Sequence, residues 1–196
     1  MLQKTRTTDP EKKYRQVLDS ALELFVKKGY HCVAIPQIVA ASGVSTGAIY
    51  NLFGNKENLA RTLHQQILDG FQTEFSTRLA DCDTAYEKLR AFAELVYEET
   101  DRDPITMEYL LFMKHEEFMD GMAPICMTEP FRLIRQIVTD GMANGEIRQG
   151  NYFISAVSYT GAILRPAQLN LECVLEGSLS EMADELIANA WAAIKA

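Results

Sequence analysis

The sequence predicts an all-α fold of nine helices, with a small N-terminal helical head and a larger helical body. Apolar residues recur every three or four positions along most of the chain, which is the period of a helix with one buried face. Strand-like alternation of apolar and polar residues never continues for more than a few positions. Cap residues, prolines and glycines divide the chain into segments of helical length.

The first helix is expected to begin at Pro10 and to end before Gly29. Asp9 is a favourable N-cap, and proline is favourable at the first helical position. Lys27 and Lys28 place positive charge in the last turn, and glycine commonly follows the last residue of a helix.

Two short helices are expected next, over residues 36–42 and 46–52. Asn55 then caps a long helix that runs to Leu79 and carries apolar residues at every fourth position. Cap residues mark the beginnings of five more helices, at Thr84, Asp103, Thr128, Asn151 and Ser178. The fifth, sixth and seventh helices should end near Asp101, Gly121 and Asn144. Pro166 should kink or break the eighth.

The composition is that of an ordinary globular protein, with 47% apolar and 23% charged residues. No apolar run approaches the roughly 20 residues that a membrane span needs. Residues 1–10 are polar and lack the apolar region of a secretion signal, so we expect a cytoplasmic location.

The net charge of −8 is unevenly divided along the chain. Residues 1–61 hold nine Lys or Arg against five Asp or Glu, a charge of +4. Residues 62–196 hold ten against twenty-two, a charge of −12. A basic head favours contact with a polyanion, and an acidic body faces away from it.

The chain shows no pattern typical of a metal, cofactor or catalytic site. Its cysteines and histidines are widely spaced, at Cys32, Cys82, Cys126, Cys173, His31, His64 and His115. Metal ligands commonly stand a few residues apart, so we expect free thiols, no metal and no cofactor. An enzyme is the main alternative, with His115 beside Glu116 and Glu117 as its best cluster. A solvated helix face explains that cluster better, so we do not expect an enzyme.

The segment from Ile35 to Lys56 has the features of a helix-turn-helix. Gly43 permits a sharp turn between the two short helices, and Ser45 is placed to cap the second. The first turn of that second helix is small-sided, with Thr46, Gly47 and Ala48. Small side chains let the backbone approach phosphates and base edges in the major groove of DNA.

Polar and charged groups follow this small-sided turn. Tyr50 and Asn51 can donate to phosphate or contact a base, and Lys56 begins the next helix. A cation at a helix start is unfavourable for the helix dipole but useful against a DNA backbone.

These residues resemble the DNA-binding region of the TetR family of transcriptional regulators. The matching residues are Gly29, Tyr30, Ile38, Gly43, Val44, Ser45, Gly47, Ile49, Tyr50, Phe53, Lys56, Glu57 and Leu59. The preceding helix also fits the family's first helix, through Ala21, Leu24 and Phe25. The remainder of the chain agrees in the number, lengths and order of its helices.

Four positions depart from the family's pattern. Ala34 stands where a Thr or Ser cap is usual, which costs on the order of 1 kcal/mol. Pro36 is expected to compensate by fixing φ. The other departures are Val39, Ser42 and Leu52, which leave the turn itself undisturbed.

The resemblance implies a DNA-binding domain over residues 1–55 and a ligand-binding and dimerisation domain over residues 56–196. The implied DNA contacts are Gln37, Ser45, Thr46, Gly47, Ala48, Tyr50, Asn51 and Lys56. A dimer would bind a near-palindromic operator with half-sites about 34–36 Å apart, or a multiple of that. The expected function is that of a repressor released by a small, mostly apolar ligand.

The middle of the chain is rich in methionine and aromatic residues, which line adaptable apolar cavities and also fill cores. The candidates for the ligand site are Phe92, Val96, Tyr109, Phe112, Met113 and Phe131. The last two helices carry small residues on one side, which allow close helix approach. We expect a homodimer through these helices, although an intramolecular seam is the alternative.

Two further readings stay open at this point. An architectural DNA-binding protein without a ligand would need a broadly basic surface, and the acidic body disfavours it. An activator remains as an alternative to a repressor, because the sign of regulation depends on where the operator lies relative to the promoter.

Overall fold

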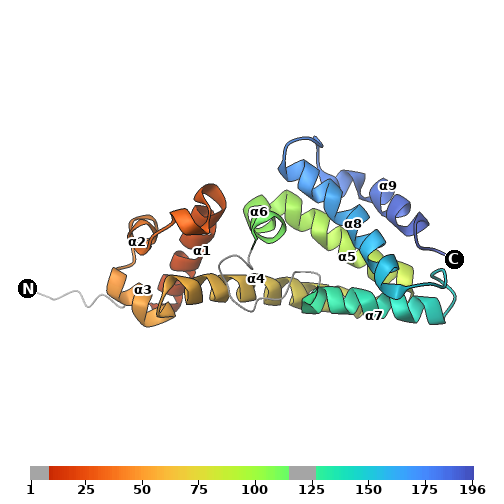
Figure 1. Ribbon diagram of the computed structural model, residues 1–196, viewed down its shortest axis with the longest axis horizontal. Coiled ribbons are helices and arrows are strands. Elements are labelled where there is room, and N and C mark those ends of the chain that lie inside the picture. The colour runs from red at the N-terminus through yellow and green to blue at the C-terminus, as the bar shows by residue number, and fades with distance from the viewer. Residues whose placement is uncertain (1–8, 115–126) are drawn as a thin grey trace, which may run out of the picture. The chain divides into compact units, whose positions relative to one another are not determined.

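A computed structural model describes residues 9–114 and 127–196 (Figure 1). In these ranges the chain forms nine α-helices and one short 3₁₀ helix, η1, in agreement with the predicted all-α class. The elements are α1 (Pro10–Lys28), η1 (Tyr30–Cys32), α2 (Ile35–Ser42), α3 (Thr46–Phe53), α4 (Lys56–Leu79), α5 (Ala85–Arg102), α6 (Pro104–Phe112), α7 (Glu129–Ala143), α8 (Tyr152–Leu171) and α9 (Leu179–Ala192).

The caps predicted for the helix beginnings explain where several helices start. The Asp9 carboxylate accepts hydrogen bonds from the backbone N–H groups of Glu11 and Lys12. Thr84 Oγ1 accepts from the N–H of Glu87 at 3.1 Å, and the Glu87 carboxylate accepts from the N–H of Thr84 at 2.9 Å. Such reciprocal bonds satisfy N–H groups that have no partner inside the helix.

Three features differ from the predictions. The 3₁₀ turn η1 was not expected, and α8 continues through Pro166 without a break. Helix α6 ends at Phe112, short of the predicted Gly121. The cluster of His115, Glu116 and Glu117 lies outside the described residues, as does Cys126.

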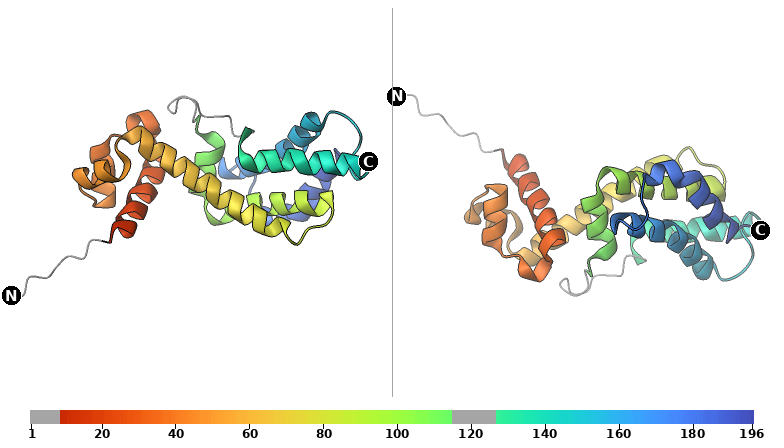
Figure 2. Two further views of the ribbon diagram at one scale, coloured as in Figure 1. Left: turned by 90° about the horizontal axis from the view of Figure 1, so that it is seen from below. Right: turned by 90° about the horizontal axis from the view of Figure 1, so that it is seen from above.

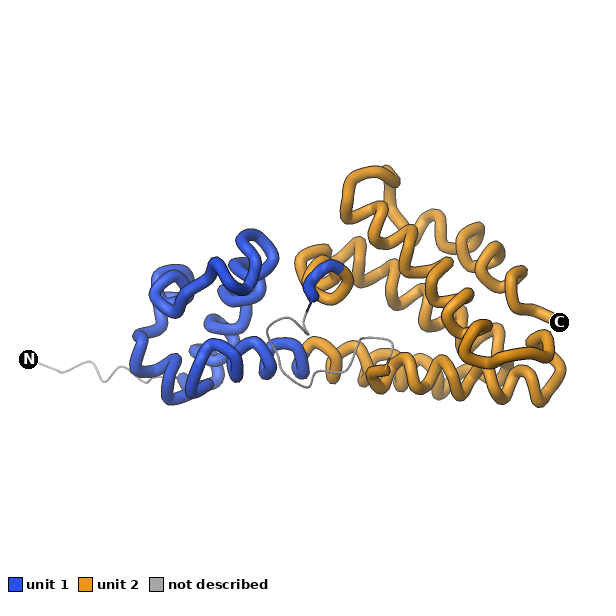
Figure 3. The backbone as a smooth tube through the Cα atoms, in the orientation of Figure 1, with its two compact units in different colours: residues 1–66, 112–121 blue, residues 67–111, 122–196 orange. Residues whose placement is uncertain are grey.

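The chain divides into two compact units, shown in Figure 3. Unit 1 comprises residues 1–66 and 112–121, and unit 2 comprises residues 67–111 and 122–196. The division falls inside α4, so this one helix contributes residues to both units. The predicted boundary after residue 55 separates a DNA-binding domain from a ligand-binding domain, and this functional division stays a prediction.

Unit 1 holds α1, η1, α2, α3 and the first part of α4. Helix α1 packs on α2, and α2 packs on α3. The buried residues of α1 are Val17, Leu18, Ala21 and Phe25, which share one helix face. Tyr14 of α1 stacks on Phe53 of α3, with ring centroids 5.2 Å apart. Helix α3 is therefore held from two sides.

Unit 2 is organised around α5, which packs against α7, α8 and α9 (Figure 2). Helix α8 also packs against α7 and α9. The Tyr159 hydroxyl of α8 donates to the Leu89 carbonyl of α5 at 3.0 Å, within the buried core. No helix in the described ranges combines the length and apolarity that a membrane span requires.

Candidate DNA-binding surface and apolar pocket

The turn between α2 and α3 is fixed by Gly43 and Ser42. Gly43 adopts a left-handed backbone conformation with φ of 69°, which residues other than glycine rarely adopt. The Ser42 hydroxyl donates to the Ile38 carbonyl at 2.7 Å and accepts from the Val44 N–H at 3.2 Å. Ser42 departs from the family's pattern, and it stabilises the turn directly.

Helix α3 has one buried face and one exposed face. Ile49 and Phe53 are buried against the rest of unit 1. Thr46, Gly47, Tyr50 and Asn51 are exposed, and their spacing along the chain places them on one side of the helix. Tyr50 is 48% exposed, which is unusual for a large aromatic side chain.

The first turn of α3 is capped and open to solvent. Ser45 Oγ accepts from the N–H of Ala48 at 3.4 Å, as its N-cap position predicts. A Cβ atom built at Gly47 would meet nothing within 4 Å. Ala48 is half-buried. Six of the eight residues predicted to bind DNA therefore gather on α3 and its cap.

Gln37 has a structural partner inside its own helix. Its side-chain Oε1 accepts a hydrogen bond from the Ala34 N–H at 2.7 Å. This bond satisfies an N–H at the beginning of α2, where Ala34 itself offers no side-chain acceptor. The Gln37 side chain therefore supplies one half of a capping box at the start of α2. The backbone N–H of Gln37, which a Thr or Ser cap would bind, donates instead to the Ala34 carbonyl at 2.9 Å.

Lys56 likewise turns toward its own protein. Its Nζ donates to the carbonyl oxygens of Tyr30 at 3.0 Å and of Val33 at 2.9 Å. The same ammonium lies 4.0 Å from the centroid of the Tyr30 ring. Burial lowers the pKa of Lys56 from its ordinary value. The two carbonyls belong to the unpredicted turn η1 and the residue after it, so this contact was not visible from sequence.

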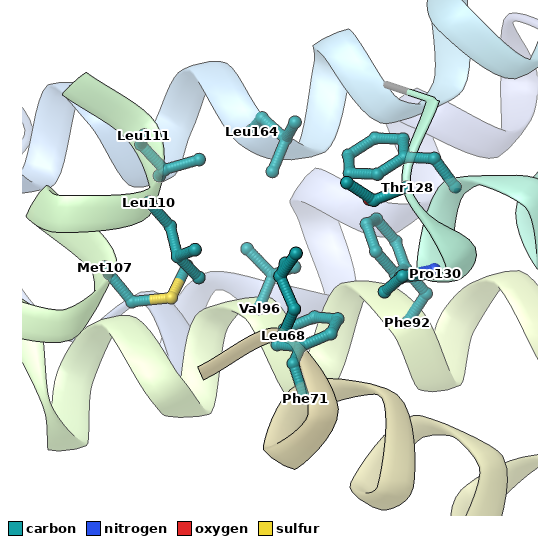
Figure 4. Close-up of a pocket in the computed structure, with 11 residues that line it drawn as sticks. Leu68, Phe71, Phe92, Val96, Met107, Leu110, Leu111, Thr128, Pro130 and Leu164 are labelled. Carbon is teal, nitrogen blue, oxygen red and sulfur yellow. The ribbon is translucent and has the colours of Figure 1, made fainter. Parts of the chain in front are cut away.

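Unit 2 contains an apolar pocket between α4, α5, α6, α7 and α8 (Figure 4). It has a volume of about 380 Å³ including its open mouth. The lining residues are Leu68, Phe71, Phe92, Val96, Met107, Leu110, Leu111, Thr128, Pro130, Phe131 and Leu164. In Figure 4 the α6 side chains lie at one end, and Thr128 and Pro130 lie at the other.

Three of the six residues predicted to bind ligand line this pocket, namely Phe92, Val96 and Phe131. The rings of Phe92 and Phe131 meet edge to face with centroids 6.0 Å apart. Tyr109 is fully buried and does not line the pocket, and neither do Phe112 and Met113.

Most of the aliphatic residues that line the pocket, such as Leu68 and Leu164, were not predicted from the sequence. Aliphatic residues at helical spacing look the same whether they face a core or a cavity. The regular apolar spacing of α4 was the one available signal, and it included Phe71.

Comparison with known proteins places the N-terminal region in a family. Residues 17–63 match the model of the bacterial regulatory proteins of the tetR family. The matched segment runs from α1 into α4, and so contains the whole helix-turn-helix.

Similarity to individual proteins extends beyond the N-terminal head into the rest of the chain. The chain is 27% identical over 141 residues to the fatty acid metabolism regulator protein of Bacillus subtilis, covering 70% of this chain and 72% of the relative. The fold is similar to that of FadR from Bacillus subtilis in complex with stearoyl-CoA, with a TM-score of 0.78, 20% identity, and 90% and 97% of the two chains covered. It is also similar to AibR in complex with isovaleryl coenzyme A and operator DNA, with a TM-score of 0.72, 19% identity, and 90% and 97% covered.

The family match and these relatives confirm the prediction of a DNA-binding regulator rather than an enzyme. The family match covers the helix-turn-helix, and the fold similarity covers nine-tenths of the chain. The helix-turn-helix region of this chain, residues 17–63, is that of the TetR family of bacterial regulatory proteins.

Proposed function

We propose that this protein is a dimeric repressor that binds a near-palindromic operator through α3 and leaves it when an apolar ligand enters the unit 2 pocket. One observation carries the DNA-binding part. The exposed, small-sided first turn of α3 shares its helix face with Tyr50 and Asn51.

The exposed face of α3 suits the major groove. The first N–H groups of a helix have no partner within it and form its positive end, which favours phosphate. Gly47 leaves room for close approach of the backbone. Tyr50 and Asn51 then supply hydroxyl and amide groups that contact phosphate or a base edge. Residues 1–55 would serve as the DNA-binding domain and residues 56–196 as the ligand-binding and dimerisation domain.

The dimer is proposed to form through α8 and α9. The N-terminal half of α8 exposes Tyr152, Phe153, Ile154 and Val157, which is a concentration of apolar side chains that water disfavours. Further along the same helix, Gly161 and Ala162 are small and exposed, as are Ala188 and Ala192 of α9. Small residues allow two helix pairs to approach closely.

The ligand is proposed to be a molecule with an aliphatic chain. Ten of the eleven lining side chains are apolar, and hydrocarbon groups gain free energy on leaving water for such a site. FadR from Bacillus subtilis was crystallised with stearoyl-CoA, and AibR with isovaleryl coenzyme A, which supports an acyl chain as the part that enters.

Helix α4 is proposed to couple the two events. Leu68 and Phe71, in the middle of α4, line the pocket, and Lys56, the first residue of the same helix, contacts η1. A ligand that displaces the pocket side of α4 would change the spacing of the two α3 helices in the dimer. This coupling requires that the ligand bind the two spacings with different affinity.

The test begins with selection of operator sites from randomised duplex DNA by the full chain. The affinity for the recovered site is then measured with and without stearate and stearoyl-CoA. Release by either molecule, with its acyl chain in the pocket, is expected. The proposal fails if no sequence is enriched, or if a molecule bound in the pocket leaves operator affinity unchanged.

A matched pair of variants locates the ligand. Val96→Phe adds a ring inside the pocket and should weaken acyl-chain binding while operator binding persists. Val174→Phe makes the same change at a side chain that is 68% exposed and is not among the lining residues, so it serves as the control. Val96→Ala, which enlarges the pocket, provides a second test if the phenylalanine variant folds poorly. Equal ligand affinity in all of these variants would exclude this pocket.

A further inference from the structure

We infer that the ligand of the unit 2 pocket carries an anionic group, that Arg132 in the first turn of α7 binds this group, and that the hydrocarbon end of the ligand lies against α6. This inference rests on the proposed ligand binding. It goes further by assigning the orientation of the ligand and the charge of its polar end.

The inside of the pocket suits hydrocarbon alone. None of the eleven side chains that line it is charged. A carboxylate or phosphate buried among them would lose its hydration without gaining a partner of opposite charge. A ligand with an aliphatic chain and an anionic group must therefore keep that group at an edge of the pocket.

The two ends of the pocket differ in chemistry (Figure 4). One end is formed by side chains of α6, and two of these, Met107 and Leu110, are buried. At the other end lies Thr128, which is half-buried and is followed directly by the exposed Glu129. The α6 end thus presents buried hydrocarbon, whereas charged side chains begin at the α7 end.

Arg132 lies on the part of α7 that borders the pocket. It comes four residues after Thr128 and directly after Phe131, and both of these residues line the pocket. Residues four apart lie on the same face of a helix. The Arg132 side chain is nevertheless 54% exposed. Its guanidinium is therefore placed to meet an anionic group that extends from this end of the pocket.

Glu129 is the present partner of this guanidinium. The Nε of Arg132 donates to the Glu129 carboxylate at 2.8 Å, and Nη2 donates to its other oxygen at 2.5 Å. These bonds use two of the five N–H donors of the arginine. An exposed ion pair of this kind contributes little free energy, and a ligand carboxylate or phosphate fits the same guanidinium fork. The ligand's anionic group therefore competes with Glu129 or binds the remaining donors.

The experiment measures binding of decanoate, decanoyl-CoA and the uncharged methyl decanoate to the full-length protein by equilibrium dialysis without DNA. Arg132→Gln should weaken decanoate, decanoyl-CoA or both by about fivefold, the scale of one exposed ion pair. Methyl decanoate should bind as it does to the parent. A loss for decanoate alone identifies a carboxylate as the bound group, and a loss for decanoyl-CoA alone identifies a phosphate.

Two further variants test the role of charge. Glu129→Gln removes the competing carboxylate and should strengthen the anion that Arg132→Gln weakens. Arg102→Gln is the matched control, because Arg102 forms an exposed pair of the same spacing with Glu99 in α5 and does not line the pocket. An equal loss for methyl decanoate in Arg132→Gln, or an equal loss for the anions in Arg102→Gln, would overturn the inference.

The orientation is tested at the α6 end. Leu111→Phe adds bulk there and should weaken dodecanoate more than octanoate, because the longer chain reaches further toward α6. Lys114 follows the last residue of α6 by two positions and is exposed, so Lys114→Gln should leave binding unchanged. Equal weakening of both chain lengths by Leu111→Phe, or loss of anion binding in Lys114→Gln, would contradict this orientation.

The absence of DNA from these measurements separates the inference from the proposed function. If the probes bind with the expected dependence on Arg132 but none releases the operator, the proposed release fails and the inference stands. If no probe binds to the parent, or if binding persists undiminished in Val96→Phe, the proposed ligand site and the inference fail together.

Discussion

The Asp101 carboxylate, near the end of α5, accepts two hydrogen bonds from Ser180 in the first turn of α9. The hydroxyl of Ser180 donates at 2.7 Å and its backbone N–H at 2.9 Å. The Ser178 hydroxyl and the Leu179 N–H donate to the same carboxylate. Asp101 thus caps a helix that begins 78 residues later in the chain, and it fastens α9 to α5.

Replacing Asp101 with alanine should destabilise unit 2 by about 1–2 kcal/mol, the usual cost of losing a helix cap. Asp81→Ala is the control, because Asp81 is an exposed aspartate of the same unit outside this contact. Urea unfolding of the two variants measures the difference. Equal stability of the two would show that the carboxylate contributes nothing.

The same group predicts a pH dependence. Burial raises the pKa of Asp101, but the hydrogen bonds from Ser180, Ser178 and Leu179 outweigh it, and the pKa lies below its ordinary value. A lowered pKa in the folded state means that the contribution is complete above the unfolded pKa of about 3.9. It should be lost as pH falls through the lower folded value. The stability difference between the parent and Asp101→Ala should therefore shrink on acidification below pH about 4, and a difference that grows would contradict this assignment.

Gly141 is required where α7 approaches the N-terminal end of α5. A Cβ at this position would lie 2.8 Å from the Cβ of Ala85 and 2.8 Å from Cδ1 of Ile147. Gly141→Ala should therefore cost about 1–3 kcal/mol through overpacking. Gly70→Ala, in the open interior of α4, should instead stabilise by about 0.5–1 kcal/mol. The midpoint temperature of thermal unfolding should fall for Gly141→Ala and rise for Gly70→Ala. A shift in the same direction for both variants would contradict the proposed close packing at Gly141.

Gln37 and Ala34 offer a test of the unusual cap on α2. Gln37→Glu keeps an acceptor for the Ala34 N–H and adds negative charge at a helix start, so stability should be retained or raised. Gln37→Ala removes the acceptor and should cost about 1 kcal/mol. Chemical denaturation distinguishes them, and an equal loss in both would argue that the hydrogen bond is unimportant.

The exposed apolar face of α8 predicts a dimer that a single charge disrupts. Ile154→Glu places a carboxylate on this face, where Ile154 is 63% exposed in the isolated chain. Desolvating an unpaired charge is costly, so sedimentation velocity should show a shift toward monomer. Val174→Glu changes an equally exposed apolar residue in the turn after α8, and should leave the dimer intact. A dimer in both variants would locate the interface elsewhere.

Local chemistry made much of the fold predictable from sequence. Asp9, Thr84 and Ser178 marked helix beginnings because their side chains accept from N–H groups that lack helical partners. The exposed face of α3 was likewise predictable. Ile49 and Phe53 are apolar and four residues apart, so they mark the buried face and leave the opposite face to solvent.

Contacts between distant segments were not predictable in the same way. The partners of Lys56 lie in η1 and at Val33, and those of Asp101 lie at the beginning of α9 and its cap. Only three of the eleven residues that line the pocket were predicted, because the lining depends on how five helices meet rather than on the pattern of any one helix. Pro166 was expected to kink or break α8, and the helix runs unbroken from Tyr152 to Leu171, where it packs against α5, α7 and α9.

The open first turn of α3 is proposed to enter the major groove of the operator, and the substitution Gly47→Leu tests this proposal. A side chain there meets nothing within 4 Å in the protein, so the variant should fold with at least parental stability. The same side chain would occupy the space that the groove needs, so operator affinity should fall by about tenfold or more. Gly70→Leu, with equally open surroundings in α4, should bind like the parent. A stable Gly47→Leu protein with undiminished operator affinity would contradict the account.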